Sequence, residues 1–457
     1  MRLDSGAFIA LFAIFFLVYS AAPSPWKRWM LVAGSVAFYA TLNPRYVPLL
    51  VGLGVFTFVI ASYIHRETIA FRRDVLLWVG VGVDLLVFVF FKGAAPAAHA
   101  LSALGVGSSS LLQVAVPLGV SFYTLQAIGC LIDVHRRVYE PPQNLVSFLA
   151  SFTLFPHLLA GPIVRSSFLV PLVEKVDAVA WPTARRALLL FMVGLVKKGI
   201  ADKLAPVADA AFDAVHPISS LEAWTGLFAY AAQLYGDFSG YTDMATALAL
   251  LLGLDLPPNF DLPYLATSPA DFWRRWHISL SSWLRDYVYI PLGVRLRRRR
   301  YTNLVATWIV AGLWHGLSPL FALYGLYHGV LLAGTDWLSR RVGGDDEVRG
   351  IRRVAQTALT LYLVFMGYVL FRARDVSAAG RYFVALHAFR APSGAVRGSL
   401  SVIAACVAAV VFGHLLDHAM RRSALERPWI LWPAMAVAVT CLALVSGAAQ
   451  PFIYAGF

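Results

Sequence analysis

Residues 271–293, DFWRRWHISLSSWLRDYVYIPLG, concentrate reactive side chains within a chain that is otherwise mostly apolar. The stretch holds three tryptophans, three arginines, two aspartates and one histidine, His277. An imidazole changes its charge near neutral pH, so it can accept protons, relay them or bind a metal. Any reactive centre of this chain is therefore first sought here.

Residues 273–287 have two faces when they are placed on an α-helix. We expect one amphipathic helix at a membrane interface, ended by Pro291. His277 lies on its aromatic face, where a histidine is more often a packed core residue than a catalyst. Within an arc of about 140°, this face holds Trp273, Trp276, His277, Leu280, Trp283, Leu284 and Tyr287. The opposite, polar face includes Arg274, Arg275, Arg285 and Asp286.

A second polar cluster lies in the apolar run 304–329, LVATWIVAGLWHGLSPLFALYGLYHG. It contains His315 in Trp-His-Gly and His328 in Tyr-His-Gly. The run reads as a span with His315 near mid-membrane depth, and an ionisable group there is a functional candidate by default. Gly312 and Gly316 flank His315 and permit close approach of a backbone or a ligand.

Three kinds of chemistry are open to these histidines: metal binding, proton relay, and general-base catalysis of a group transfer. Ligation by neighbours on one helix favours i, i+4 spacing. His277 and His315 are 38 residues apart and His328 follows after 13 more, so no local metal motif is present. Haem ligation by paired histidines stays open.

The composition predicts an all-α polytopic membrane protein. Hydrophobic residues make up 59% of the 457 residues and charged ones only 14%, whereas soluble domains average about 25% charged. About 11–13 runs are long enough to be transmembrane or re-entrant helices. The first run, 6–22, is followed by Lys27 and Arg28, the opposite of a secretory signal, so we interpret it as a retained span. Other clear runs are 47–64, 75–91, 354–371, 399–416 and 429–447.

The net charge of +13 comes from short basic connections between apolar runs, including Arg295 and Arg297–Arg300. This pattern is typical of positive-inside loops that face lipid headgroups, and it argues against a nucleic-acid partner. The three cysteines (Cys130, Cys406 and Cys441) are far apart, which excludes a disulfide framework or zinc motif of the usual spacing.

The chain is expected to be one integral-membrane domain, 1–457. Plain spans (1–110) precede a core rich in polar and helix-breaking residues (115–335), and plain spans follow (354–457). In the core, Pro156, Gly161 and Pro162 are expected to interrupt a helix. Asp237 and Asp243 lie beside an apolar run, and intramembrane carboxylates usually pair with a base or face a polar cavity.

The core resembles the membrane-bound O-acyltransferase (MBOAT) family, and it is most similar to the bacterial branch that includes alginate O-acetyltransferase. The resemblance rests on residues 235–293, which end in DFWRRWHISLSSWLRDYVYIPLG, and on GLWHG at 312–316. Further matches are VPLGVSFYTLQAIGCLIDVHRR (116–137), FPHLLAGPIVR (155–165) and the terminal PFIYAGF (451–457).

The resemblance implies a helical membrane fold around a central funnel or tunnel, in the bacterial cytoplasmic (inner) membrane. It implies an acyl thioester donor such as acetyl-CoA on the cytoplasmic side, with no bound cofactor and no metal. The acceptor would be a hydroxyl of an exported polysaccharide, reached directly or through a periplasmic SGNH-type acetyltransferase partner. The basic cluster at 295–300 would attract the donor's phosphates or, equally, touch lipid headgroups.

The family's two active-site positions carry over to His277 and His315. His315 would be the base for the acceptor hydroxyl, or would pass the acyl group to a partner's serine. His277, or a nearby arginine or tryptophan N–H, would orient the donor or stabilise developing charge. Asp237, Asp243 and Asp286 are expected to be ion-pair partners of arginines rather than proton carriers. Further candidates for substrate or donor contact are Trp273, Arg274, Arg275, Trp276, Arg285, Asp286, Trp314, Asp237 and His328.

Three positions depart from the family pattern. His157 stands where glutamine is expected, Asp261 where asparagine is expected, and Val294 where a second glycine is expected. ALYGLYHG (322–329) also resembles relatives that move D-alanine onto teichoic acids. D-alanyl transfer is therefore the alternative function within the family. A proton-coupled transporter and a haem or quinone electron carrier are the alternatives outside it.

Overall fold

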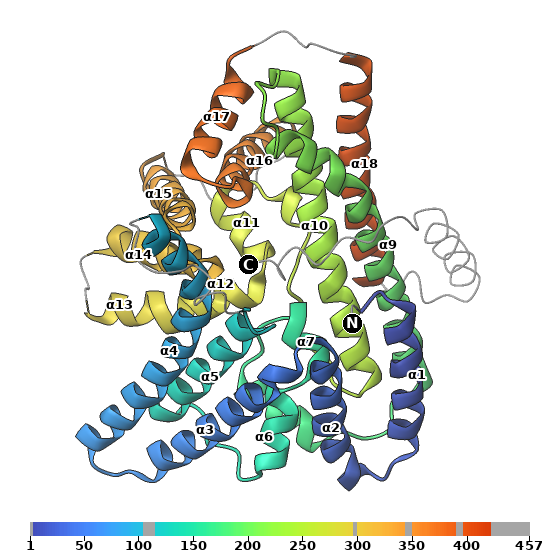
Figure 1. Cartoon of the computed structure of the whole chain (residues 1–457), viewed down its shortest axis with the longest axis vertical. Coiled ribbons are helices and arrows are strands. Elements are labelled where there is room, and N and C mark those ends of the chain that lie inside the picture. Colours follow the sequence, from blue (N-terminus) through green and yellow to red (C-terminus); the bar gives the residue numbers. More distant parts are fainter. Residues whose placement is uncertain (1–2, 104–114, 296–298, 343–349, 390–395, 422–457) are drawn as a thin grey trace. The chain divides into compact units, whose positions relative to one another are not determined.

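All regular secondary-structure elements of the described residues are helices (Figure 1). The structure is a computed structural model that describes residues 3–103, 115–295, 299–342, 350–389 and 396–421. These residues form two compact units. One is Met1–Phe191 with Thr242–Pro257, and the other is Met192–Tyr241 with Pro258–Phe457. The predicted run 429–447, the terminal motif 451–457, Cys441, Arg297 and Arg298 lie outside the described residues.

The first unit is built from short and long apolar helices. Its helices are α1 (Gly6–Ala21), α2 (Ser24–Leu42), α3 (Val47–Arg66), α4 (Ala70–Ala103), α5 (Val120–His135), α6 (Leu145–Phe152), α7 (Phe155–Ala160) and α8 (Ser166–Glu174). It also takes the first turns of α9 (Trp181–Phe212) and the last turns of α10 (Ser220–Leu251). Polar caps set several starts: Ser5 accepts from Phe8 N before α1, and Asn144 accepts from Val146 N and Ser147 N before α6.

The predicted interruption around residue 160 is confirmed, although Pro156 acts differently from the expectation. Pro156 lies in the first turn of α7, where a missing N–H is tolerated, so it starts a helix and does not break one. The helix ends at Ala160, and Gly161 and Pro162 continue as extended backbone. His157, the departure from the family pattern, is buried, and its Nε2 lies 3.2 Å from the Ser151 carbonyl oxygen.

The second unit carries the reactive residues. It contains the later turns of α9, the earlier turns of α10, α11 (Pro269–Arg275), α12 (Ile278–Leu284), α13 (Ile290–Arg295), α14 (Arg300–His315), α15 (Pro319–Val342), α16 (Gly350–Arg372), α17 (Val376–His387) and α18 (Val396–Arg421). A π-helical turn, Arg285–Tyr289, joins α12 to α13.

The prediction of a single helix over 273–287 ended by Pro291 is wrong. The helix stops at Arg275, and Trp276 is extended. His277 takes a left-handed conformation before α12 begins at Ile278. Pro291 is the second residue of α13, which continues directly from the π-helical turn, so it does not end the helix. The wheel failed because two non-helical residues rotate everything that follows them relative to α11.

The apolar run 304–329 is a hairpin of two packed helices, not one span (Figure 1). His315 is the last residue of α14 and therefore lies at a helix end. The sequence had suggested a position in the middle of a span. Gly312 and Gly325 make the close contact. A Cβ on Gly312 would lie 2.1 Å from the Phe321 carbonyl oxygen, and one on Gly325 would lie 2.2 Å from that of Trp308. The predicted close backbone approach at Gly312 is confirmed.

Four helical segments of the described residues are long and apolar enough to cross a membrane: Pro44–Arg66, Ala70–Ala94, Gly350–Arg372 and Gly398–Arg421. Gly6–Ala21 is a shorter apolar helix. The predicted runs 47–64, 75–91, 354–371 and 399–416 each fall within one of the four. The chain is thus a multi-pass helical membrane protein, while the count of about 11–13 helices and the central funnel stay predictions.

Helices α9 and α10 cross closely within the second unit and bring buried charges together. A Cβ on Gly236 would lie 2.9 Å from the Lys197 carbonyl oxygen, and one on Gly240 would lie 2.7 Å from that of Gly194. This G-x-x-x-G pattern is the small-residue contact typical of membrane helices. Beside it, buried Lys198 pairs with Asp202 and, at 2.9 Å, with Asp237. The partner of Asp237 is therefore a lysine and not the predicted arginine.

The α14–α15 contact gives a first testable prediction. Gly325→Ala forces a methyl group against the Trp308 carbonyl oxygen, and overpacking of this kind costs about 1–3 kcal/mol. Gly334→Ala in the same helix is the matched control, because a Cβ there meets nothing within 4 Å. We expect the thermal unfolding midpoint in detergent to fall for Gly325→Ala only. An unchanged midpoint for Gly325→Ala would contradict the close crossing.

The buried Lys198 gives a second prediction. Lys198→Met removes the cation shared by Asp202 and Asp237, and breaking a buried pair costs about 3–5 kcal/mol. The control is Lys203→Met, an exposed lysine in the same helix, for which a change within about 0.5 kcal/mol is expected. Denaturant unfolding in detergent measures both. Equal stabilities of the two variants would show that the ion pairs contribute nothing.

Candidate active site

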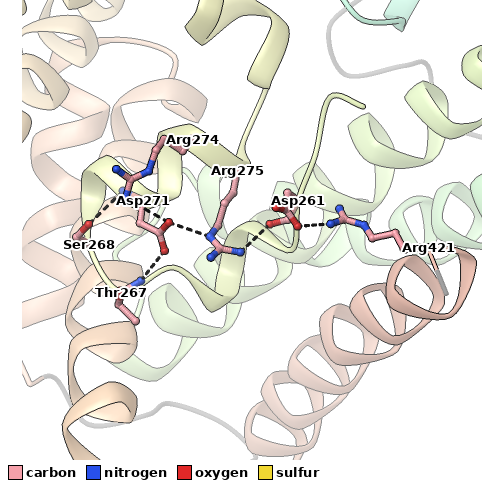
Figure 2. Close-up of polar contacts among 7 residues, drawn as sticks. All are labelled: Asp261, Thr267, Ser268, Asp271, Arg274, Arg275 and Arg421. Carbon is pink, nitrogen blue, oxygen red and sulfur yellow. Dashed lines mark hydrogen bonds and ion pairs between the residues drawn. The ribbon is translucent and has the colours of Figure 1, made fainter. Parts of the chain in front are cut away.

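The start of α11 is fixed by local capping (Figure 2). The Ser268 hydroxyl accepts a hydrogen bond from Asp271 N at 3.1 Å, and Pro269 occupies the first turn. One turn later, Arg275 Nε donates to Asp271 Oδ1 at 3.0 Å. The sequence Ser-Pro-x-Asp-x-x-x-Arg thus begins a short helix and holds Arg275 along it.

The loop before α11 is held by two arginines (Figure 2). Arg275 Nη1 donates to the Asp261 carbonyl oxygen at 3.2 Å, and Asp261 N donates to the Arg275 carbonyl oxygen at 2.8 Å. Arg421, the last residue of α18, pairs with the Asp261 carboxylate and donates to the Phe260 carbonyl oxygen at 3.0 Å. Asp261 departs from the asparagine of the family pattern, and Arg421 supplies the cation that accommodates its charge.

His277 occupies the break between α11 and α12. Its φ is +45° and its ψ is 53°, a left-handed conformation that is uncommon for a residue other than glycine. The side chain is 1% exposed, and its ring meets Phe238 edge-on at a centroid distance of 4.8 Å. Its Nδ1 lies 3.2 Å from Asn259 Oδ1. Strained backbone of this kind is concentrated at functional sites.

His315 ends α14 and is 5% exposed. Its ring packs against Phe371 of α16 at a centroid distance of 5.0 Å and against Phe321 of α15 at 6.2 Å. The C-terminal end of a helix carries partial negative charge, which favours a cation there. An imidazole at this position can therefore accept a proton with electrostatic support from α14.

The tertiary structure brings the three histidines into one chain of aromatic contacts, which we call the histidine cluster. Its members are His277, Trp314, His315, Tyr324 and His328. Successive ring centroids are 6.0, 4.8, 6.0 and 4.7 Å apart. Residues 38 and 13 positions apart in sequence thus belong to a single buried site.

His328 closes the cluster against α11. Its ring is fully buried and lies 5.0 Å from that of Trp273, centroid to centroid, and a Cβ on Gly367 would fall 2.3 Å from its Nε2. Trp273 also packs against Trp308 at 4.2 Å. Among the sequence-predicted residues, His277, His315, His328, Trp273 and Trp314 are therefore brought together.

The remaining predicted residues have other surroundings. Arg274 is 72% exposed and pairs with Asp271. Arg285 is 61% exposed and pairs with Asp286, the arginine pairing that we expected for this aspartate. Trp276 is buried and stacks against Tyr264 at 6.1 Å. Arg275 supports the loop, and Asp237 pairs with Lys198 as described above.

Sequence reasoning missed Asn259, Tyr324 and Phe371. Asn259 lies in the loop LPPNF, where no helical or strand period marks a side chain as inward-facing. Tyr324 and Phe371 read as ordinary apolar members of spans. Only the pairing of α14 with α15 and α16 reveals that they contact His315.

The cluster suits proton transfer away from water, because its histidines are buried. A buried imidazole at a helix end can take the proton of a hydroxyl that attacks an activated carbonyl. Within the described ranges, no group of three or more His, Cys, Asp or Glu side chains is arranged to hold a metal ion. Acid–base chemistry by histidine is within reach of these residues.

Comparisons with known proteins identify relatives of this chain. The family model of MBOAT, the membrane-bound O-acyltransferase family, matches residues 138–343. The probable alginate O-acetylase AlgI of Azotobacter vinelandii is 37% identical over 85% of this chain and 78% of its own length.

Two further relatives carry other acceptors in their names. The peptidoglycan O-acetyltransferase of Helicobacter pylori is 33% identical over 80% of this chain and 75% of its own length. The teichoic acid D-alanyltransferase of Streptococcus thermophilus is 29% identical over 57% of this chain and 67% of its own length. Identity of this extent with the first two relatives shows that the chain is an acyltransferase of the membrane-bound O-acyltransferase family.

Proposed function

We propose that this chain moves an acetyl group from a cytoplasmic thioester donor, acetyl-CoA, across the membrane to hydroxyls of an exported polysaccharide. The observation that carries the proposal is the burial of His277 and His315 in one aromatic cluster of an O-acyltransferase. The names of two relatives, alginate O-acetylase and peptidoglycan O-acetyltransferase, support acetyl as cargo and a glycan as acceptor. A periplasmic SGNH-type partner and the bacterial inner membrane belong to the same proposal.

The chemistry follows from the nature of the donor. A thioester carbonyl is already activated, so the enzyme needs a base for the acceptor and stabilisation of the oxyanion. His315 takes the proton of the acceptor hydroxyl as its oxygen bonds to the carbonyl carbon. The C–S bond then breaks, and His315 passes that proton to the sulfur, which leaves as the thiol. Transfer through a partner's serine uses the same base and the same bond changes.

Removal of the base tests the proposal directly. His315→Ala should lower ester-linked acetate on exported glycans of the native host by on the order of 10²-fold or more, the lower range of what a placed base contributes. The control is His387→Ala, an exposed histidine on α17, compared at equal protein levels in the membrane. Unchanged acetate in His315→Ala would contradict acetyl transfer by this base.

D-alanyl transfer is the second candidate, supported by the similarity to a teichoic acid D-alanyltransferase. It predicts that D-alanine esters of wall polymers, and not acetate, disappear in His315→Ala. Assay of both esters on the same cells separates the two cargoes. Loss of neither ester would contradict both cargoes and indicate transfer of another acyl group.

A further inference from the structure

Asn259 makes hydrogen bonds to three successive residues at the break between α11 and α12. Its carbonyl oxygen accepts from Ile278 N at 2.9 Å. Its side-chain Oδ1 accepts from Ser279 N at 3.1 Å and from Ser279 Oγ at 2.8 Å, and lies 3.2 Å from His277 Nδ1. The side chain is 1% exposed, so these contacts form away from water.

These bonds hold the strained backbone of His277. A left-handed conformation is unfavourable for a residue with a side chain and persists only where its surroundings impose it. His277 precedes α12 but makes no side-chain capping bond, so the first N–H groups of that helix need another acceptor. Asn259 provides it for Ile278 and Ser279, the two residues that follow the strained one.

The same contacts determine which ring nitrogen of His277 carries hydrogen. A backbone N–H can only donate, so the Asn259 atom bound to Ser279 N must be the carbonyl oxygen and not the amide nitrogen. A carbonyl oxygen can only accept, so His277 Nδ1 must be the donor to it. The Ser279 hydroxyl, 3.5 Å from Nδ1, already donates to Asn259 Oδ1 and is consistent with the same assignment.

The imidazole of His277 is neutral at physiological pH. It lies outside the four apolar spans, and burial lowers its pKa to about 3. A neutral imidazole carries one hydrogen, so protonation of Nδ1 leaves the lone pair on Nε2.

We propose that Asn259 is a positioning residue that holds His277 as the Nδ1–H tautomer, with Nε2 as a hydrogen-bond acceptor for a substrate group. The proposal rests on the proposed function for its catalytic meaning. It changes the expected role of His277, because an Nε2 lone pair cannot donate to an oxyanion. His277 then receives a hydrogen bond, such as that of a hydroxyl, and oxyanion stabilisation falls to other N–H groups.

The tautomer is measured by solid-state NMR of the full chain, labelled with ¹⁵N-histidine and reconstituted in lipid bilayers. The His277 signals are those lost in His277→Gln. We expect the wild-type protein to show a protonated Nδ1 and an unprotonated Nε2. Ser279→Ala should leave this pattern unchanged, because the acceptor Asn259 Oδ1 remains. A protonated Nε2 in wild type would overturn the proposal.

Substitutions of Asn259 connect the tautomer to activity. Asn259→Leu removes the acceptor and should lower ester-linked acetate on exported glycans on the order of 10²-fold, with the Nδ1–H pattern lost. Asn259→Asp keeps an acceptor at the same place and should restore both the pattern and most of the acetate. If Asn259→Leu retained full acetate, or Asn259→Asp failed to restore the pattern at equal protein level, the positioning role would be refuted.

The outcomes separate this proposal from the proposed function. The NMR pattern requires no acetyl transfer. Suppose that the wild-type protein shows the Nδ1–H pattern but produces no acetate ester. That result would support the positioning role and refute the acetyl assignment. If Asn259→Leu does not accumulate in the membrane, the wild-type, Ser279→Ala and Asn259→Asp spectra still decide the tautomer.

Discussion

A peptide group inside a bilayer has no water to bind, and the rest of this structure follows from that constraint. Each N–H and C=O must find a partner within the protein, so the described chain is built of helices that satisfy their own backbone. A reactive centre, however, needs side chains that converge from several directions. A continuous helix presents its side chains at fixed intervals along one axis and cannot supply such convergence alone.

The reactive residues accordingly lie where helices end. His277 sits between α11 and α12, and His315 is the final residue of α14. Each break frees backbone groups that must be satisfied again. At the His277 break, Asn259 accepts the hydrogen bonds of the freed backbone groups. The loop that carries Asn259 is in turn hydrogen-bonded to Arg275 and Arg421 (Figure 2). The polar residues around the site therefore have a structural role, which is distinct from contact with a substrate.

Close helix crossings bury the histidines in tightly packed surroundings that exclude water. The glycines of α14 and α15 let two backbones touch, which brings Tyr324 against His315 at the end of α14 and His328 against Trp308. Buried charge is tolerated where it is paired, as Lys198 is with Asp237. Aromatic rings also contact the cluster, among them Phe371 and Trp273. Histidines in such a setting are shielded from solvent, which suits proton transfer while an acyl group moves from a thiol to a hydroxyl.

The sequence by itself determined the class of protein, because hydropathy depends only on composition along the chain, and four of its predicted runs coincide with apolar helices. It also determined the family, through motifs of many residues, and it identified His277 and His315 as candidates. Periodicity could not foresee the break at Trp276–His277, since the hydrogen bonds that hold it come from Asn259, which is distant in sequence. The role of Asn259 and the convergence of the three histidines were decided only by tertiary structure, because a loop residue has no period and a contact between helices leaves no mark on either helix alone.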